Sequence, residues 1–265
     1  MIRYLMPLIF TFLFAGCDKI EYSPNQKLDR DGPRNVNRVN LEKLAQTNGD
    51  DTVRFILSGD TQRGYGEARD FVKKANTLPG IDFAVIAGDI SDFGLLQEME
   101  WVAEIYNRLK IPYIGVIGNH DLTANGKDVF QKVFGELDYS FVYGGIKFIC
   151  INTNSREFNF NGTVPDIQWL NKEMKSQSGI NKMVVISHVS PLSADFDKKL
   201  EQPFVEALAS TGNCLASLHA HDHTSGYFTP YETGPPFIVT SAILKREFTV
   251  ITIANGRLES DNVSY

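Results

Sequence analysis

Five short segments of the chain carry residues that could bind a metal ion. They are Gly59-Asp60-Thr61-Gln62, Gly88-Asp89-Ile90-Ser91-Asp92, Gly118-Asn119-His120-Asp121, Ser187-His188 and His219-Ala220-His221-Asp222-His223. A carboxylate can bridge two cations, an amide oxygen is a hard neutral ligand, and imidazoles suit first-row transition metals. Each segment alone is weak evidence, because about one Gly-Asp pair is expected by chance in a chain of this length. Together, in this order, they predict a metal site.

The elements that must position these residues are strands, because each segment follows an apolar run of strand length. Such runs, rich in Val, Ile and Phe, are typical of strands buried on both faces. In an open α/β sheet, ligands bind beyond the carboxyl ends of the strands, so separate segments can converge there. The predicted strands are Val53 to Ser58, Phe83 to Ala87, Tyr113 to Ile117, Ile146 to Asn152, Met183 to Ser187 and Cys214 to Leu218.

Amphipathic stretches between these runs predict helices. Apolar residues recur at helical spacing from Ala68 to Leu78 and from Leu95 to Leu109. Two further helices are expected to begin at Pro165 and Pro203, since proline is favoured in a first helical turn. The C-terminal part, from Phe237 to Ile253, is β-rich with no helix between its runs. This alternation predicts one α/β layered domain, which we place at residues 39–265.

The series Asp-x-Gln, Gly-Asp-x-x-Asp, Gly-Asn-His-Asp, His and Ala-His-Asp-His resembles the motifs of calcineurin-like metallophosphoesterases. Gly-Asn-His-Asp is its most diagnostic element, and the series runs from Asp60 to His223. The resemblance implies a four-layer α/β/β/α sandwich with a two-metal site at its edge. It also implies hydrolysis of a phosphomonoester or phosphodiester by a hydroxide that bridges the two metals.

The resemblance also assigns roles to individual residues. His120 would donate a proton to the leaving oxygen or stabilise transition-state charge, and the adjacent Asp121 could orient its ring. Asp89 would bridge the two cations. The implied ligands of the first cation are Asp60, Gln62, Asp89 and His223, and those of the second are Asp89, Asn119, His188 and His221.

Two positions, Gln62 and Ala220, depart from the commonest family pattern, and a third, Asp92, separates the chain from one branch of the family. Gln62 stands where histidine is more common, which favours Mn²⁺, Mg²⁺ or Fe²⁺ over Zn²⁺ and leaves the metal identity open. Ala220 replaces a usual glycine, and His219 offers a second register, so either His219 or His223 completes the last motif; we favour His223. Asp92 occupies the place of the iron-binding tyrosine of purple acid phosphatases, which argues against that branch.

The charge balance limits the partners of the site. With a formal charge of −6 and no basic footprint, the chain is not expected to bind nucleic acid as its main partner, although a nucleotidase or nuclease would use the same site. We expect a small-molecule phosphoester substrate. Arg63 and Arg156 could contact phosphate oxygens or could be solvated surface residues. A competing function is a non-catalytic surface lipoprotein that binds a phosphate-bearing ligand. The substrate and the oligomeric state are not predicted.

The N-terminus is typical of an export signal. An apolar run from Leu5 to Ala15 follows Arg3 and leads to Gly16-Cys17, which resembles a bacterial lipoprotein cleavage site. We therefore expect a signal peptide over residues 1–16 and a lipid anchor on Cys17. A polar tether over residues 17–38 would hold the domain at the membrane of the bacterial cell envelope. The alternative is an ordinary cleaved signal peptide with an incidental cysteine.

The remaining cysteines, Cys150 and Cys214, lie within apolar runs. We expect them to be buried as small hydrophobic residues, and a single disulfide between them is the alternative.

Overall fold

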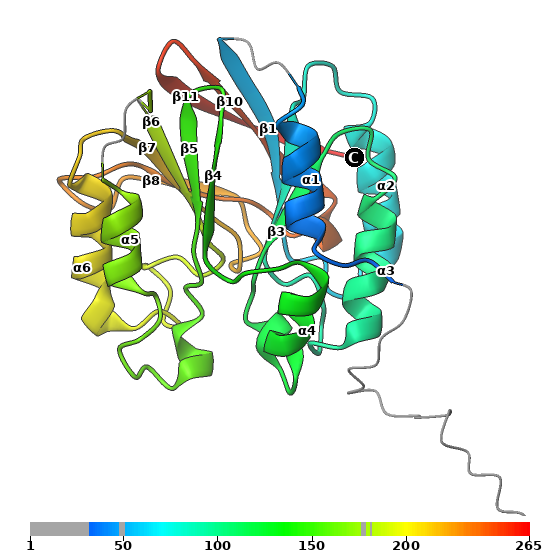
Figure 1. The fold of residues 1–265 in the computed structure, drawn as a ribbon, viewed down its shortest axis with the longest axis horizontal. Coiled ribbons are helices and arrows are strands. Elements are labelled where there is room, and N and C mark those ends of the chain that lie inside the picture. Colours follow the sequence, from blue (N-terminus) through cyan, green and yellow to red (C-terminus); the bar gives the residue numbers. More distant parts are fainter. Residues whose placement is uncertain (1–31, 48–50, 176–178, 181) are drawn as a thin grey trace, which may run out of the picture.

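The computed structural model describes residues 32–47, 51–175, 179–180 and 182–265, which fold around two mixed β-sheets (Figure 1). The first sheet has five strands in the order β11-β10-β1-β2-β3. The pairs β1/β2 and β2/β3 are parallel, whereas β10 is antiparallel to both of its neighbours. The strands are β1 Thr52–Ser58, β2 Phe83–Ala87, β3 Tyr113–Val116, β10 Glu247–Ala254 and β11 Arg257–Ser264.

The second sheet has six strands in the order β4-β5-β6-β7-β9-β8. Its centre is parallel from β5 to β9, and the outer strands β4 and β8 are antiparallel to their neighbours. The strands are β4 Tyr139–Tyr143, β5 Ile146–Cys150, β6 Lys182–Ile186, β7 Cys214–His219, β8 Gly226–Phe228 and β9 Phe237–Val239.

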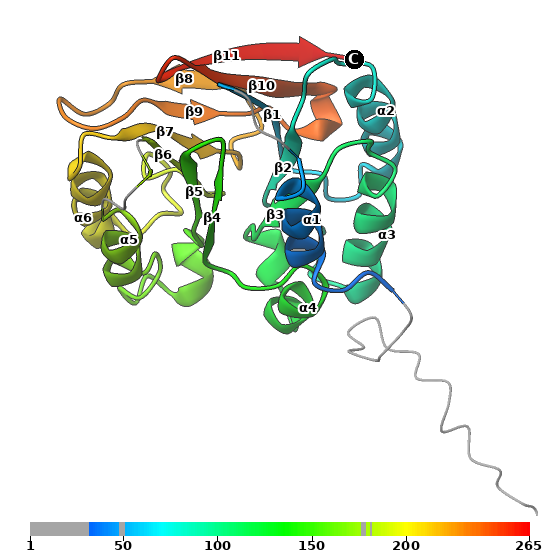
Figure 2. The same ribbon diagram turned by 45° about the horizontal axis from the view of Figure 1, so that its top comes forward.

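Helices cover the outer face of each sheet, which gives the predicted α/β/β/α order of layers. Figures 1 and 2 show α1 to α4 on the side of the first sheet and α5 and α6 on the side of the second. The helices are α1 Val36–Leu44, α2 Tyr65–Ala75, α3 Leu96–Tyr106, α4 Gly126–Val133, α5 Ile167–Glu173 and α6 Lys198–Ala209. Short 3₁₀ turns are η1 His120–Leu122, η2 Ser155–Phe158 and η3 Ile243–Lys245.

Three apolar clusters hold the layers together. The central one lies between the sheets and includes Phe55, Phe83 and Phe148, whose rings are buried and pack against one another. The second fills the space between the first sheet and α2, α3 and α4, and the third lies under α5 and α6. Strands between two such clusters must be apolar on both faces, which is why their sequences predicted them.

The structure corrects three details of the predicted elements. The helix expected to begin at Pro203 begins at Lys198 instead, because Asp197 caps it by accepting a bond from the Lys199 amide, and Pro203 lies inside it. Pro165 precedes the N-cap residue of α5 instead of lying in its first turn. The turn η3 interrupts the C-terminal β-rich region that we expected to lack helix.

The predicted signal peptide and the predicted lipid anchor on Cys17 lie outside the described residues. Helix α1 begins at Val36, three residues before the predicted start of the domain. Among the described helices, none has both the length and the apolar character required to span a bilayer. Cys150 and Cys214 are both free, so the predicted alternative of a disulfide between them is wrong.

Candidate active site

All five predicted segments meet at one edge of the molecule. Asp60, Asp89 and Asn119 follow β1, β2 and β3 of the first sheet, whereas His188 and the segment of His221 follow β6 and β7 of the second. Because these neighbouring strands are parallel, their carboxyl ends lie side by side. The site is therefore built by both sheets.

The backbone is left-handed at five of these positions. The φ angles are 53° at Asp60, 43° at Gln62, 52° at Asp89, 71° at His221 and 57° at His223. Such a conformation costs roughly 1 to 2 kcal/mol per residue for most side chains other than glycine, and less for aspartate, whose short polar side chain can form local hydrogen bonds. Hydrogen bonds between the loops hold it in place, including those from the Asp60 amide to the Gly88 carbonyl (3.1 Å) and from the Gln62 amide to the Asp89 carbonyl (2.9 Å). Strained backbone of this kind is concentrated at functional sites.

Asp60, Asp89 and His223 form one group of potential ligands, with one ligand atom of each within 4.8 Å of the others. Oδ1 of Asp60 is buried without a hydrogen bond and lies 3.3 Å from Nε2 of His223. Asp60 also raises the pKa of His223. Nε2 of the Gln62 side chain lies 3.5 Å from Oδ2 of Asp89. Rotation of the side-chain amide would exchange its nitrogen and oxygen, so that the oxygen faces the group.

Asn119, His188 and His221 form a second group beside Asp89. Oδ1 of Asn119 lies 3.0 Å from Nε2 of His188 and 3.1 Å from Nδ1 of His221, and these two nitrogens are 3.3 Å apart. Nδ1 of His188 lies 2.7 Å from the Ala87 carbonyl oxygen, so it carries the hydrogen and Nε2 faces the group. The same Nε2 is 3.3 Å from Oδ1 of Asp89.

The charges and ligand atoms of these groups are compatible with a cation. Burial disfavours the charged forms of Asp89 and His188. The attraction between their opposite charges outweighs this effect of burial in both residues. The pKa of Asp89 falls to about 2, and that of His188 rises to about 10. The site thus holds a proton among oxygen and nitrogen atoms that are good metal ligands. Oδ1 of Asp60, which has no hydrogen-bond partner, is a further ligand atom. The arrangement fits one cation held by Asp60, Gln62, Asp89 and His223 and another held by Asp89, Asn119, His188 and His221.

The alternative histidine, His219, makes its ring contacts with residues outside both groups. Its ring is fully buried and packs against Phe237, with ring centroids 5.3 Å apart, and Nδ1 is 3.0 Å from Oγ of Ser187. Burial lowers the pKa of His219 to about 3, so the ring is neutral. The structure therefore places His223, and not His219, beside Asp60.

His120 stands at the rim of the site, with 39% of its side chain exposed. Its backbone amide donates to Oδ1 of Asp89 (3.0 Å), and Nε2 lies 4.0 Å from Oδ2 of the same residue. Nδ1 lies 2.9 Å from the carbonyl oxygen of Asp92, and Oδ1 of Asp92 is 3.7 Å away. Asp92 is thus the residue that orients the ring.

Asp121 has a different environment from the one that we expected. Its buried carboxylate accepts bonds from the amides of Ile90 (3.2 Å), Ser91 (2.7 Å) and Gly118 (2.9 Å). Burial and the charge of Asp89 raise its pKa to about 6. Asp121 therefore ties the loop after β2 to the loop after β3, which corrects the expectation that it orients the His120 ring.

Both candidate arginines are held by carboxylates next to site histidines. Nε of Arg63 lies 2.7 Å from Oδ2 of Asp92, and its guanidinium lies 5.1 Å from the ring centre of Phe93. Arg156 pairs with Asp195 at 2.8 Å. Asp195 was missed in the sequence because a single acidic residue in a loop carries no recognisable pattern.

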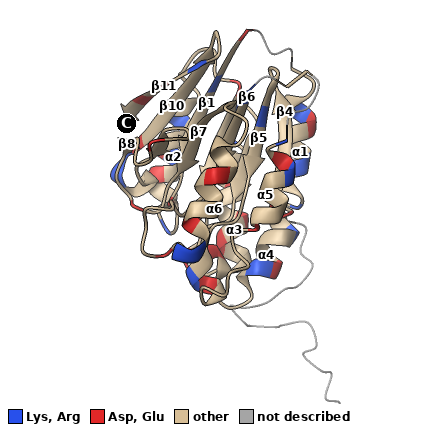
Figure 3. Cartoon of the chain, turned by 90° about the vertical axis from the view of Figure 1, so that its left-hand side faces the viewer, with Lys and Arg blue, Asp and Glu red and all other residues tan. Residues whose placement is uncertain are grey.

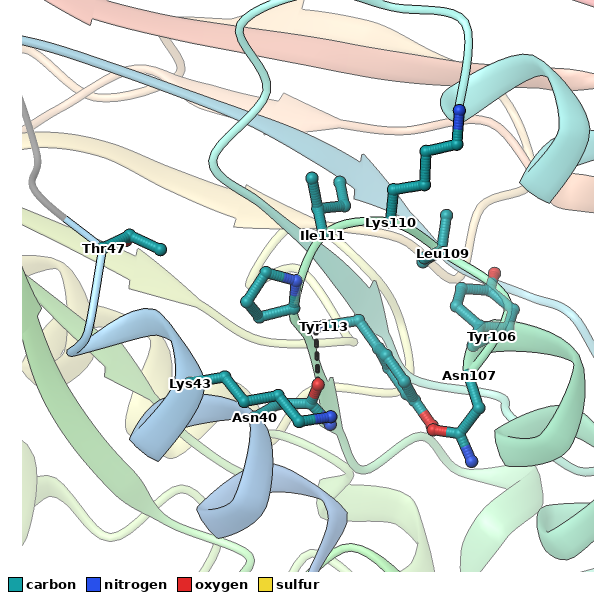
Figure 4. Close-up of a pocket in the computed structure, with 10 residues that line it drawn as sticks. Asn40, Lys43, Thr47, Tyr106, Asn107, Leu109, Lys110, Ile111 and Tyr113 are labelled. Atoms are coloured by element: carbon teal, nitrogen blue, oxygen red, sulfur yellow. Dashed lines mark hydrogen bonds between the residues drawn. The ribbon is translucent and has the colours of Figure 1, made fainter.

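A cavity of about 250 Å³ lies at the opposite edge of the first sheet (Figure 4). Lys43 of α1 lines it together with Lys110, Pro112 and Tyr113, which lead into the amino end of β3. The Tyr113 amide donates to Oδ1 of Asn40 there (3.4 Å). Since the ligand groups follow the carboxyl ends of the strands, this cavity is separate from the candidate site.

The chain is similar to known phosphoesterases. A family profile described as calcineurin-like phosphoesterase matches residues 53–225. A 3',5'-cyclic-nucleotide phosphodiesterase of Nostoc sp. is 25% identical over 161 residues, which cover 58% of this chain and 60% of the relative. A probable cyclic nucleotide phosphodiesterase of Xenorhabdus bovienii is 28% identical over 87 residues, which cover 33% of this chain and 34% of the relative.

The fold is similar to that of a solved dimetal phosphatase from Danio rerio. The TM-score is 0.64 at 16% sequence identity, and the alignment covers 80% of this chain and 99% of that one. At this identity the similarity shows a common fold.

Proposed function

The chain belongs to the calcineurin-like phosphoesterase family, and on that basis we propose that it hydrolyses phosphoric esters with the aid of two divalent cations. The observation that carries the proposal is the convergence of two ligand groups on Asp89, with Asp60 and His223 on one side and His188 on the other. When bound, the cations would offset phosphate charge and lower the pKa of a water molecule that they share. Gln62 favours Mn²⁺, Mg²⁺ or Fe²⁺ in the first position.

The residues around the cations supply the remaining chemistry. With Nδ1 of His120 held by the Asp92 carbonyl at 2.9 Å, Nε2 is the nitrogen that can carry a proton to the leaving oxygen. Nε of Arg63 lies 2.7 Å from Oδ2 of the Asp92 carboxylate, and 65% of the Arg63 side chain is exposed, so its guanidinium can also contact a phosphate oxygen. His120 and Arg63 therefore serve the leaving group and the bound phosphate.

As the substrate class we propose a phosphodiester, with 3',5'-cyclic nucleotides to be tested first. Both relatives described above are named as cyclic nucleotide phosphodiesterases, although the chain spans less than two thirds of the length of either. Phe93 is 47% exposed next to Asp92, and an exposed aromatic ring offers a surface on which a base can stack. Helix α6 carries charges of both signs (Figure 3), and the formal charge of the chain is −6, which suits a small substrate better than a long polyanion.

We test the proposal with Asp89→Asn and His120→Ala. Asp89→Asn removes the charge that two cations would share, so metal content and turnover should fall together. His120→Ala should keep both metals while turnover falls about 10² to 10⁴-fold, the usual contribution of a general acid. The loss should be smallest for nitrophenyl esters, whose leaving group needs little protonation.

Glu42→Gln is the matched control, because it removes one carboxylate from an exposed ion pair on α1. It should change neither readout. Equal metal loss in Asp89→Asn and His120→Ala would make His120 a ligand. A wild-type protein that binds two metals but turns over none of a panel of mono- and diesters would favour the alternative of a phosphate-binding surface protein.

A further inference from the structure

Asp195 lies in the loop between β6 and α6 and reaches a ligand histidine from outside the metal groups. Its Oδ2 is 3.1 Å from Nε2 of His221, and its side chain is 19% exposed. The other nitrogen of that ring, Nδ1, faces Asn119 at 3.1 Å and His188 at 3.3 Å. Asp195 and the metal groups therefore lie on opposite sides of the imidazole.

The second oxygen of Asp195 is held by another loop. Nη1 of Arg156, in η2, donates to Oδ1 at 2.8 Å, and the Arg156 amide donates to the Asp195 carbonyl at 3.2 Å. The Asp195 amide in turn donates to Oγ of Ser193 at 3.2 Å. The carboxylate is thus fixed at both oxygens and through its backbone.

This geometry determines where the hydrogen of the neutral ring must be. A carboxylate only accepts hydrogen bonds, so Nε2 of His221 carries the hydrogen and Nδ1 keeps its lone pair. A ligand histidine must present a bare nitrogen to its cation, and the partner on its other nitrogen sets both the tautomer and the ring direction.

We infer that Asp195, clamped by Arg156, is a positioning residue that aims Nδ1 of His221 at the second cation. The inference rests on the proposed function, because it requires that cation. Asp195 is not itself a ligand of the same ion, since it binds the far side of the ring. It also gives Arg156 a role that does not depend on contact with substrate.

The experiment measures Mn²⁺ binding by equilibrium dialysis, without substrate. Asp195→Ala removes the acceptor and should weaken the second site about 10 to 100-fold, the usual effect of losing such a partner. Asp195→Asn keeps an oxygen that can accept from Nε2 and should restore most of the affinity. The Mn²⁺ affinity of Arg156→Ala should lie between that of wild type and that of Asp195→Ala.

Asp222→Asn is the matched control, because Asp222 is exposed and directly follows His221. It removes the same charge without removing the acceptor at Nε2, so Mn²⁺ affinity should change far less than the roughly 10 to 100-fold loss expected for Asp195→Ala. ¹⁵N NMR of the metal-free proteins supplies a second readout. Nε2 of His221 should carry the hydrogen in wild type and in Asp195→Asn, and the tautomers should mix in Asp195→Ala.

Equal weakening by Asp222→Asn and Asp195→Ala would overturn the inference, because charge alone would then explain the loss. A wild-type ring with its hydrogen on Nδ1 would overturn it as well. Since neither readout needs turnover, a protein that binds Mn²⁺ with this pattern but hydrolyses no ester would refute the proposed function and leave the role of Asp195 standing.

Discussion

Asp138 offers a test of the forces that hold the edge of the site. Its Oδ1 accepts a short bond from the Asn152 amide (2.6 Å) just beyond β5. Oδ1 of Asn152 accepts a hydrogen bond from Nδ2 of Asn154. The same Nδ2 donates to the carbonyl oxygen of Ile117 (3.0 Å), one residue before the Gly118-Asn119 segment. Burial, aided by nearby acidic residues, raises the pKa of Asp138 to about 6.

A raised carboxyl pKa means that the folded chain binds the proton more tightly than the unfolded chain does. The free energy of unfolding should therefore fall as the pH rises from about 4 to 6 and then stay constant. The difference between about 6 and the ordinary value of 3.8 corresponds to at most about 3 kcal/mol at pH 7.5, and about half of that at pH 5.

Asp138→Asn keeps an oxygen that can accept from the Asn152 amide but cannot ionise. The variant should be more stable than wild type at pH 7.5, and its advantage should shrink by about 1 to 1.5 kcal/mol at pH 5. Urea unfolding followed by circular dichroism at both pH values measures this difference. Equal destabilisation at both values would refute the reasoning, because it would show that the ionised carboxylate is needed where it lies.

Three further changes probe the site and the N-terminus. Gln62→His should raise Zn²⁺ or Fe²⁺ occupancy relative to Mn²⁺, as measured by metal analysis of purified protein; an unchanged profile would show that Gln62 is not a ligand. Gly88→Ala should lower metal content, because a Cβ at this left-handed position (φ 91°) would lie 2.4 Å from Nδ1 of His188, and full metal content would show that the ring can move aside. Cys17→Ser should release the protein from membranes into soluble fractions if Cys17 carries a lipid anchor, whereas an equally soluble wild type would contradict that anchor.

The buried strands were predictable because their neighbours require apolar residues on both faces. Helix α1 was not, since polar contacts join it to the first sheet beside only two buried apolar residues, Val36 and Leu44. The Asn37 side chain donates to the carbonyl of Gly115 at 2.9 Å and accepts from its amide at 2.7 Å, which satisfies the edge strand β3. A helix attached through asparagines has little apolar period to recognise.

At the site, the sequence predicted which residues converge but not what orients them. Asp92 and Asp121 lie within three residues of predicted ligands, and their order along the chain suggested the wrong partner for the His120 ring. The path of the loops decides this, because it turns the Asp121 carboxylate toward the amides of Ile90 and Ser91. Asp195 depends in the same way on a contact between distant loops.

The left-handed backbone at the ligand positions has a consequence for protein engineering. Glycine would adopt the angles of Asp60, Asp89 and His221 at lower conformational cost than the native side chains. Selection of variants for heat resistance without added metal would therefore reward replacement of the ligands themselves. The same selection carried out with saturating metal should retain the ligand residues. Metal binding stabilises the folded state and so opposes the gain in stability from replacing them. The conditions of such a screen would decide whether the stabilised protein keeps its metal site.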